Sequence, residues 1–585
     1  MRIAEIDDKR PAREDVRCFF GLNRRESRQT GESRDEENVT GELSPFLSTR
    51  RDAVKLTDSF GTCCAIMMKD HPAWVTEVTG GAASKLYYAG LDTSVVLSPG
   101  KKQLVSMGTK IIVFPDKVWY DTANGESGSL DAEFSSEDEV TVTYSLSRLD
   151  GAEYDATSSA VAPPSPADGA YWCDTSGTTA SLMRYSESSG TWSPVDSTFI
   201  KISTPGIGAP FSVGDGVVIS SSVVSSLNGA HVIEEKGDGF IVVAGIITSV
   251  ETQSTPITVS RRAPAVDLAV EYSNRIWACR SGLDNNGRLV NEIYATKLGD
   301  PFNWNCFAGL ASDSYAAGVG SDGPFTGAAV FLGYVMFFKE RCVHKVFGTK
   351  PSNYQVITSN IRGVARGAES SLCVMDEMLY FAGVDGIMAY DGAVPEVISE
   401  PLGEISPDGC CAASRGRRLF VSAKYGSARD LYVYDTKSAV WHRYSPLPVE
   451  AMAGCSAGVF AAAGGSLYVI DSKDGGAAAS DLTGYASRSS VKESWYFETG
   501  ELTAETEDRY VERVEISCAV AAGGEMTVEL ITEEDGRVPV VTLRPTVRRT
   551  FVVPVVTGRH RRARIKVSGY GDAVVYSMAK FVKKC

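Results

Sequence analysis

Long hydrophobic runs are missing from this sequence. The longest apolar stretch, residues 328–338, is interrupted by Gly333, and the mean hydropathy is −0.08. A transmembrane helix needs about 20 apolar residues, so we expect no membrane segment. The first eight residues lack the apolar core of a signal peptide, so we expect no secretion by that route.

Basic residues are too few to coat a nucleic acid. The 585 residues include 58 Lys and Arg against 73 Asp and Glu, which gives a net charge of −15. Tight binding along a DNA backbone needs a basic surface, so this charge disfavours it. The net negative charge remains compatible with an acidic surface along which DNA slides without adhering.

Metal-binding patterns are also scarce. The 13 cysteines form no CxxC pair, and most lie in apolar stretches, which indicates reduced, buried thiols of a protein assembled in a cytoplasm. The five histidines are far apart in the sequence. We therefore expect no metal site and no cofactor.

Helical periodicity is nearly absent, and short runs of Val, Ile, Tyr and Phe recur between Gly, Asp, Asn and Ser. The 56 glycines suit many turns. Strands of about four to eight residues separated by such turns predict an all-β fold.

One tetrapeptide recurs at the ends of hydrophobic strands, and we call it the strand-end tetrapeptide. Its copies from residue 294 onward are spaced by 53, 43, 44 and 36 residues. A period near 44 fits one four-stranded blade of a β-propeller, and we expect six to eight blades over residues 59–128 plus 264–475. The copies begin at Tyr120, Tyr294, Phe347, Tyr390, Tyr434 and Ile470, with a weaker one at Tyr88.

One spacing in this series is too long. Tyr120 and Tyr294 are 174 residues apart, which leaves about 130 residues beyond one period. We therefore predict an inserted small β domain at 129–263, because blade loops lie on the surface and tolerate insertions. Beyond the repeats, alternating strands predict a C-terminal β-sandwich at 476–585.

The beginning of the chain, residues 1–58, is predicted as an extended N-terminal arm. It is rich in charge and has few apolar clusters. One interpretation is a partly disordered arm; the other is an arm that orders against a neighbouring subunit, anchored by Phe19, Phe20 and Phe46.

Motifs that carry chemistry are weak, so we predict no catalytic residue and expect that the chain is not an enzyme. Gly454-Cys-Ser-Ala-Gly458 matches GxSxG, but no helix follows the serine. Ser186–Trp192 resembles a sialidase-type turn without its aspartate, and Asp284–Gly287 lacks the other ligands of a calcium loop. Glu137–Glu139 is interpreted as a solvated loop.

The C-terminal region is locally basic. The favoured interpretation is polar strand faces and edge protection, and the alternative is a docking face for acidic neighbours. Direct binding of nucleic acid is less favoured, because stacking aromatics are not interleaved. The basic residues are Arg544, Arg548, Arg549, Arg559, Arg561, Arg562, Arg564, Lys566, Lys580, Lys583 and Lys584.

Four stretches together resemble the β-propeller tail proteins of tailed bacteriophages, which form the nozzle, or DNA-stabilising plug, below the portal and adaptor. The stretches are Glu42–Arg51, Asn274–Arg280, Asn291–Trp304 and Phe337–Gly348. In Asn291–Trp304 the pattern NEIY, LGD and NW is a strand–turn–strand signature without chemistry. The resemblance covers about residues 40–475 and implies no catalytic residue.

The resemblance implies a structural virion protein of the tail, synthesised in the host cytoplasm. Its copies would form a ring, with a hexamer as the family expectation, that continues the DNA channel and retains and then releases the genome. The partners would be other copies, the tail adaptor or other tail proteins, and packaged DNA passing without sequence-specific contact.

Two alternatives stay open for a tail protein of this kind. One is a propeller glycosidase acting on host-surface glycans, which would need carboxylates converging on the propeller axis. The other is a module that binds carbohydrate or protein through the inserted domain or the sandwich. Trp172 and Trp192 are its candidate stacking residues, although core packing is the favoured interpretation of both.

Overall fold

The computed structural model describes residues 11–57, 59–78, 80–284, 286–444, 447–472, 489–491, 493–500, 509–533, 536–555, 558, 560 and 562–584. Within these ranges the regular structure consists of β-strands and four short 3-10 helices, so the prediction of an all-β fold is confirmed. No helix in the described ranges has the length and apolar character needed to cross a membrane. The 3-10 helices are η1 (Ser225–Leu227), η2 (Pro351–Asn353), η3 (Glu369–Ser371) and η4 (Glu400–Leu402).

The chain divides into two compact units. Unit 1 contains residues 1–102, 325–345 and 358–585, and unit 2 contains residues 103–324 and 346–357. Both units are built largely from antiparallel sheets in which consecutive strands are neighbours. Such up-and-down meanders are the form of a propeller blade, so the fold is β-propeller-like.

Unit 1 holds three four-stranded meanders and a five-stranded sheet with strand order β42-β43-β44-β5-β45. In the latter, β5 from the beginning of the chain pairs antiparallel with β44, so a strand more than 400 residues away completes the sheet. The strands of these sheets are β6 (Cys63–Met68), β7 (Pro72–Glu77), β8 (Ser84–Tyr88), β9 (Leu91–Leu97), β34 (Cys373–Met375), β35 (Met378–Gly383), β36 (Gly386–Tyr390), β37 (Glu396–Val397), β38 (Ile405–Arg415), β39 (Arg418–Tyr425), β40 (Ala428–Asp435), β41 (Val440–Tyr444), β42 (Val449–Gly454), β43 (Val459–Ala463), β44 (Ser466–Ile470), β5 (Ala53–Thr57) and β45 (Ser489–Val491).

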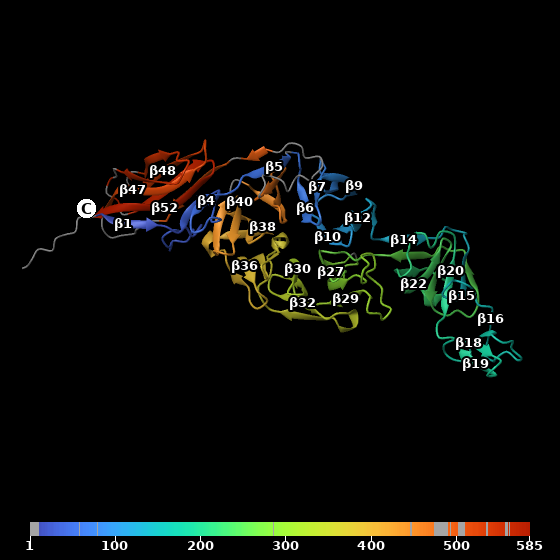
Figure 1. Cartoon of the computed structure of the whole chain (residues 1–585). Helices are drawn as coiled ribbons and strands as arrows, with labels where there is room; N and C mark the ends of the chain where they lie inside the picture. Colours follow the sequence, from blue (N-terminus) through green and yellow to red (C-terminus); the bar gives the residue numbers. More distant parts are fainter. Residues whose placement is uncertain are drawn as a thin grey trace, which may run out of the picture. The chain divides into compact units, whose positions relative to one another are not determined.

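Unit 1 also contains a six-stranded and a further five-stranded sheet that include the C-terminal strands, and the N-terminal segment contributes to both. β1 and β4 pair with β52, and β2 pairs with β46. Figure 1 shows the blue strands β1 and β4 beside the red strands β47 and β52. The strands are β1 (Ala12–Val16), β2 (Ser33–Glu37), β3 (Val39–Thr40), β4 (Leu47–Thr49), β46 (Ser494–Thr499), β47 (Arg509–Val520), β48 (Glu525–Thr532), β49 (Gly536–Leu543), β50 (Arg549–Pro554), β51 (Ala563–Tyr570) and β52 (Ala573–Lys584).

These two sheets share one hydrophobic core. Side chains from β46, β47, β48, β51 and β52 meet in it, together with Val16, Phe19, Val39 and Leu47 from the N-terminal segment. The Phe19 ring meets Phe497 edge to face at a centroid distance of 5.9 Å. The segment predicted as an extended arm is thus part of the core of the C-terminal region of its own chain.

Unit 2 contains two four-stranded meanders, β10–β13 and β26–β29, an eight-stranded sheet with order β14-β25-β21-β22-β23-β20-β15-β24, and a small sheet, β16–β19. The strands are β10 (Gln103–Met107), β11 (Lys110–Phe114), β12 (Val118–Asp121), β13 (Ser127–Ser129), β14 (Ala132–Ser135), β15 (Val142–Ser147), β16 (Ala156–Ser159), β17 (Tyr171–Asp174), β18 (Ser181–Ser186), β19 (Thr191–Pro194), β20 (Phe199–Ser203), β21 (Gly216–Ser220), β22 (Gly229–Gly237), β23 (Phe240–Ala244), β24 (Glu251–Gln253), β25 (Thr258–Arg261), β26 (Leu268–Tyr272), β27 (Arg275–Leu283), β28 (Leu289–Ala295) and β29 (Tyr315–Gly318).

Four more strands follow in the chain. β30 (Gly327–Phe331) and β31 (Tyr334–Phe338) pair antiparallel in unit 1. β32 (Val343–Phe347) and β33 (Gln355–Ser359) each have residues in both units.

The strand-end tetrapeptide occupies one structural position throughout. Tyr88, Tyr120, Tyr294, Tyr390 and Tyr434 lie at or next to the end of β8, β12, β28, β36 and β40, each the third strand of its meander. The tetrapeptide therefore marks the end of the third strand.

Aromatic side chains at this position pack between neighbouring sheets of unit 1. Tyr434 meets Tyr380 of β35 at 6.4 Å, and Tyr390 meets Phe331 of β30 at 5.9 Å between ring centroids. Such contacts bury the faces of four-stranded sheets that cannot bury them alone.

Several hairpins within the meanders are two-residue turns in left-handed backbone conformation. The pairs Ser273–Asn274 and Gly464–Gly465 both have positive φ at each residue. Turns of this kind match the twist of the flanking strands, which favours Asn and Gly there.

Buried His344 makes the stability of unit 1 depend on pH. The side chain is fully buried, and desolvation, with a smaller contribution from Lys339, lowers its pKa from 6.5 to about 4. Because the unfolded chain then binds the proton more tightly, the free energy of unfolding falls as the pH drops from about 6.5 to 4.

We expect unit 1 to lose about 2 kcal/mol of stability between pH 7 and pH 5 from this group. His344→Gln should remove that part of the pH profile, and His71→Gln serves as the control because His71 is only half-buried. Denaturant unfolding of the native chain and both variants at pH 7 and pH 5 measures this loss of stability. Equal pH profiles for the native chain and His344→Gln would contradict the assignment.

Candidate functional site

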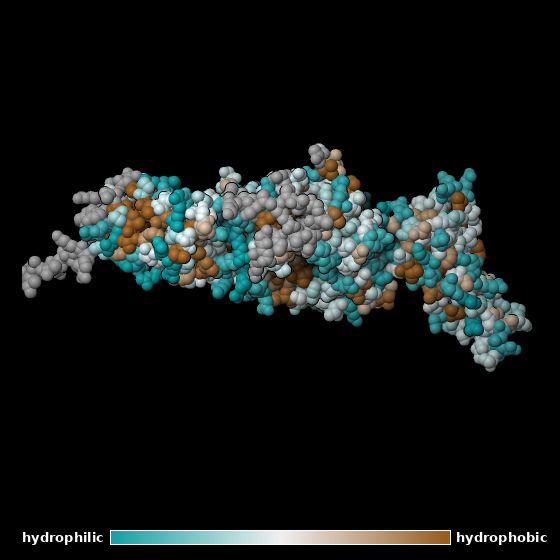
Figure 2. Space-filling model, turned by 45° about the horizontal axis from the view of Figure 1, so that its top comes forward, coloured by the Kyte–Doolittle hydropathy of each residue, from teal (hydrophilic) through white to brown (hydrophobic). Residues whose placement is uncertain are grey.

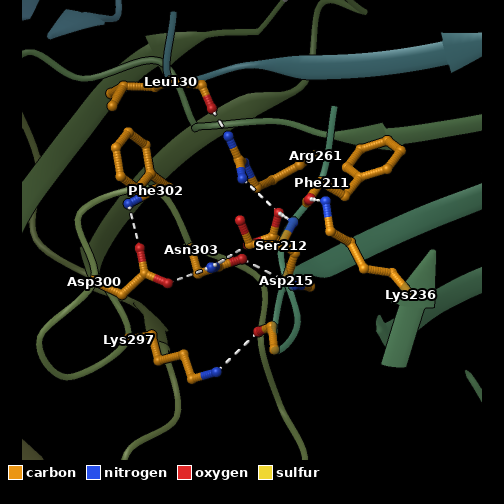
Figure 3. Close-up of polar contacts among 12 residues, drawn as sticks. Leu130, Phe211, Ser212, Asp215, Lys236, Arg261, Lys297, Asp300, Phe302 and Asn303 are labelled. Carbon is orange, nitrogen blue, oxygen red and sulfur yellow. Dashed lines mark hydrogen bonds and ion pairs between the residues drawn. The ribbon is translucent and has the colours of Figure 1, made fainter. Parts of the chain in front are cut away.

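The first candidate site is a buried polar network in unit 2, at the junction between the eight-stranded sheet and the loop that joins β28 to β29 (Figure 3). Asn303 of this loop lies at its centre and is fully buried. Its side-chain amide donates to Asp215 at 2.9 Å and to Asp300 at 2.5 Å, and its side-chain oxygen accepts the Gly216 N–H at 2.8 Å. One amide thus holds the turn before β21 against the loop.

Charge in this network is compensated by a buried ion pair. Arg261 of β25 donates to the Asp215 carboxylate at 2.5 Å, and its guanidinium lies 5.3 Å from the centre of the Phe302 ring. The same carboxylate accepts the Ser212 N–H at 2.9 Å. Loss of any one donor would leave the buried Asp215 carboxylate with incomplete hydrogen bonding. The donors together therefore stabilise a single arrangement of the junction.

The NEIY, LGD and NW signature provides part of this junction. Asp300 and Asn303 belong to it, and Lys297 before them donates to the Gly214 carbonyl at 2.8 Å. The sequence pattern of the signature predicts strand–turn–strand structure but does not indicate its partner Asp215, which lies 85 residues before Asp300 in the chain. The available signal was the pair of short polar residues, Asp300 and Asn303, flanking an apolar Pro-Phe in a loop.

The second candidate site is an open pocket on the small sheet β16–β19, which we call the β17–β18 pocket. Its volume is about 840 Å³. The strand register sets Tyr171, Arg184 and Ser193 in one row across β17, β18 and β19, so their side chains share a face. Its lining includes Asp168, Tyr171, Arg184, Glu187, Ser193 and Asp196.

The two tryptophans singled out as stacking candidates lie on the opposite face of this sheet. Trp172 is 7% exposed, and its indole N–H donates to the Ser159 carbonyl at 3.0 Å. Trp192 is half-buried and meets Trp172 at 5.4 Å and Tyr185 at 5.3 Å between ring centroids. Both rings therefore pack against each other, and the pocket on the other face was missed because its residues are single polar side chains in short strands.

The weak chemical motifs lie in connections between strands. Gly454–Gly458 joins β42 to β43, and Glu137–Glu139 is an exposed connection between β14 and β15. Ser186–Trp192 forms the β18–β19 hairpin, and the Asp284 carboxylate accepts the Arg288 N–H at 2.8 Å in the β27–β28 connection. Among the described residues, no group of three or more His, Cys, Asp and Glu side chains is placed to hold a metal ion.

Several basic residues of the C-terminal region pair with acidic side chains of the same unit. Arg544 pairs with Glu525 at 2.6 Å, Arg564 with Glu498 at 2.8 Å, and buried Lys580 with Glu14 at 3.0 Å. Arg548 and Lys566 lie over aromatic rings. Arg559 and Arg561, and the side chain of Lys584, lie outside the described residues.

No known protein family matches the chain, and no curated protein matches it. Solved structures with partial likeness include an exo-β-1,3-galactanase from Phanerochaete chrysosporium with galactose, at 9% identity and a TM-score of 0.19, covering 54% of this chain and 95% of that one. A glycoside hydrolase family 43 arabinoxylan arabinofuranohydrolase from Bacillus subtilis is 10% identical, with a TM-score of 0.17. The match covers 70% of this chain and 94% of that one.

A third similar structure is PorZ, a bacterial surface component of the type-IX secretion system of Porphyromonas gingivalis. It is 9% identical, with a TM-score of 0.25, and the match covers 84% of this chain and 75% of that one.

The expectation that the chain is not an enzyme is contradicted by these comparisons, because the galactanase and the arabinofuranohydrolase are glycoside hydrolases. At these identities and TM-scores the likeness assigns neither a reaction nor a catalytic residue to this chain.

Proposed function

We propose that the chain is a structural virion protein of a bacteriophage tail, whose copies form a ring below the portal and adaptor. The meanders would be the blades of one propeller of six to eight blades, with an inserted β domain and a C-terminal β-sandwich. The ring would continue the DNA channel and retain and then release the genome. The net charge of −15 would limit adhesion of DNA during its passage.

The observation that carries this proposal is the interlock of the two chain regions in unit 1. A wall that holds packaged DNA is loaded mechanically, so its parts must resist separation. The N-terminal segment pairs with β46 and β52, and its Glu36 contacts His442 of β41 at 2.7 Å in a fully buried pair. Arg443 beside it donates to the Tyr496 hydroxyl at 2.7 Å. These contacts tie a meander, the N-terminal segment and the C-terminal sheets together.

Electron microscopy of purified particles tests the proposal. The expected result is a rotationally symmetric ring of this chain below the adaptor, a hexamer by family expectation, in contact with the DNA channel. Particles that lack the chain, or a chain that is found only as isolated monomers in particles and in solution, would contradict it.

The alternative proposal is a tail protein that binds or cleaves host-surface glycans. The specific observation that favours it is the β17–β18 pocket, which combines an aromatic ring, hydroxyls and carboxylates. Incubation of the chain with capsular and cell-wall polysaccharides, followed by measurement of new reducing ends, tests the cleaving form. Activity that single Asp or Glu substitutions abolish would support it, and intact polysaccharides would contradict it.

A further inference from the structure

We infer that the β17–β18 pocket binds a neutral oligosaccharide. This inference deepens the glycan alternative by naming the site and the ligand class, and it holds whether or not the chain forms a ring. Figure 1 shows β18 and β19 at the end of unit 2 away from β27 and β29, and the pocket lies entirely within unit 2.

The strand register explains why a pocket opens at this place. On the same face as Tyr171 and Arg184, the neighbouring row of Cys173 and Leu182 is 1% exposed at both residues, and Leu182 belongs to the core of the inserted sheet. One row further along, Tyr171 is half-buried and Arg184 is exposed. The face therefore passes from core to solvent within one row, which leaves an aromatic ring and polar groups at an open edge.

The backbone around this edge is held in place before any ligand arrives. The Gly169 N–H donates to the Tyr185 carbonyl at 3.0 Å, and the Tyr185 N–H donates to the Ala170 carbonyl at 2.9 Å. The Asp168 carboxylate accepts the Glu187 N–H at 2.9 Å. A pocket that is already ordered loses little conformational entropy when it binds.

The Tyr171 ring is fixed as well. It meets Tyr154 edge to face at 4.8 Å between centroids, and the Arg148 guanidinium lies 6.0 Å from its centre. A fixed aromatic ring offers a negative π-face to polarised C–H groups, and the faces of a pyranose ring are rich in such groups.

The polar lining suits the hydroxyl edges of a sugar. Carboxylates accept hydrogen bonds from hydroxyl groups, Arg184 donates several, and Ser193 does both. Most of the lining residues are charged or carry a hydroxyl group, which suits a ligand rich in hydroxyl groups. The volume of about 840 Å³ lies within the ordinary range of small-ligand pockets.

Charge selects among sugars at this site. Asp168, Glu187 and Asp196 line the pocket against the single cation Arg184, so the lining is net negative. Like charge would repel phosphates, uronic acids and nucleic acids. In Figure 2 the surface over β16–β19 is mostly teal to white, with small brown areas.

Titration of the full chain with four neutral tetrasaccharides, of glucose, galactose, mannose and N-acetylglucosamine, tests the inference by calorimetry. Hyaluronan tetrasaccharide is the anionic comparison. We expect at least one neutral tetrasaccharide to bind, to bind at least tenfold more tightly than the anionic one, and to slow hydrogen exchange in residues 168–196.

Arg184→Ala and Tyr171→Leu should each weaken that binding at least tenfold, whereas Ser181→Ala, exposed on the opposite face of β18, should leave it unchanged. Arg184 is exposed, so its variant keeps the test valid if Tyr171→Leu fails to fold. Binding of none of the four neutral sugars overturns the inference. Binding that Arg184→Ala leaves intact, or that protects residues other than 168–196, also overturns it.

Discussion

Replacing Phe19 with alanine is expected to destabilise the C-terminal sheets of unit 1 by about 3 kcal/mol, because the substitution removes a core aromatic and leaves a cavity. The ring is 9% exposed and packs on Phe497 within the core shared by the two sheets. Hydrogen exchange of residues 494–499 and 563–570 should accelerate about a hundredfold.

Phe20 provides the matched control, because it is the same residue type one position further along the chain and is 41% exposed. Phe20→Ala should change the exchange rates little. Equal acceleration by both variants would contradict the assignment of Phe19 to the core.

The same experiment addresses the alternative in which the N-terminal segment orders against a neighbouring subunit. Pairing of β1 with β52 within one chain predicts protection that does not depend on protein concentration. Protection that is lost on dilution would show that the segment is exchanged between copies.

Replacing Asn303 with alanine is expected to have the largest effect in unit 2, a loss of about 3 kcal/mol. The variant removes two hydrogen bonds to carboxylates and leaves the buried Gly216 N–H without its acceptor. Exchange in residues 212–220 and 296–306 should accelerate, and proteases should cut the chain at this junction sooner.

Asn305→Ala is the matched control, since Asn305 is exposed and donates only a 3.2 Å hydrogen bond to the Arg262 carbonyl. Asn303→Asp adds a buried carboxylate between Asp215 and Asp300, so its cost should exceed that of Asn303→Ala and grow as the pH rises. Unchanged proteolysis in both Asn303 variants would contradict a role of this side chain in holding the junction.

Local patterns in the sequence were sufficient to predict the meanders. Side-chain alternation, an aromatic strand end and a turn of Asp, Gly or Thr are short-range features, so the strand-end tetrapeptide at Tyr390 and Tyr434 marks the third strand correctly. The same locality explains why a strand, β43, follows the serine of Gly454–Gly458 and no helix does, as the sequence predicts.

Patterns of charge were less informative. The segment before β5 is rich in charge and was interpreted as an arm, yet Glu36 is fully buried against His442 and Arg50 is buried against Glu493. Charged residues usually remain in solvent unless they are paired, and pairs more than 400 residues apart leave no signal in the local sequence.

The amino-acid order alone determined that the described part of the chain is built from strands and where the third strand of the meanders ends, because these properties depend on neighbours in the chain. Only the tertiary structure decided that β5 completes the sheet of β44, that Phe19 enters the C-terminal core, and that Asn303 holds the turn at Asp215. Strand pairing and burial between segments hundreds of residues apart depend on which surfaces meet, and that is a property of the folded chain as a whole.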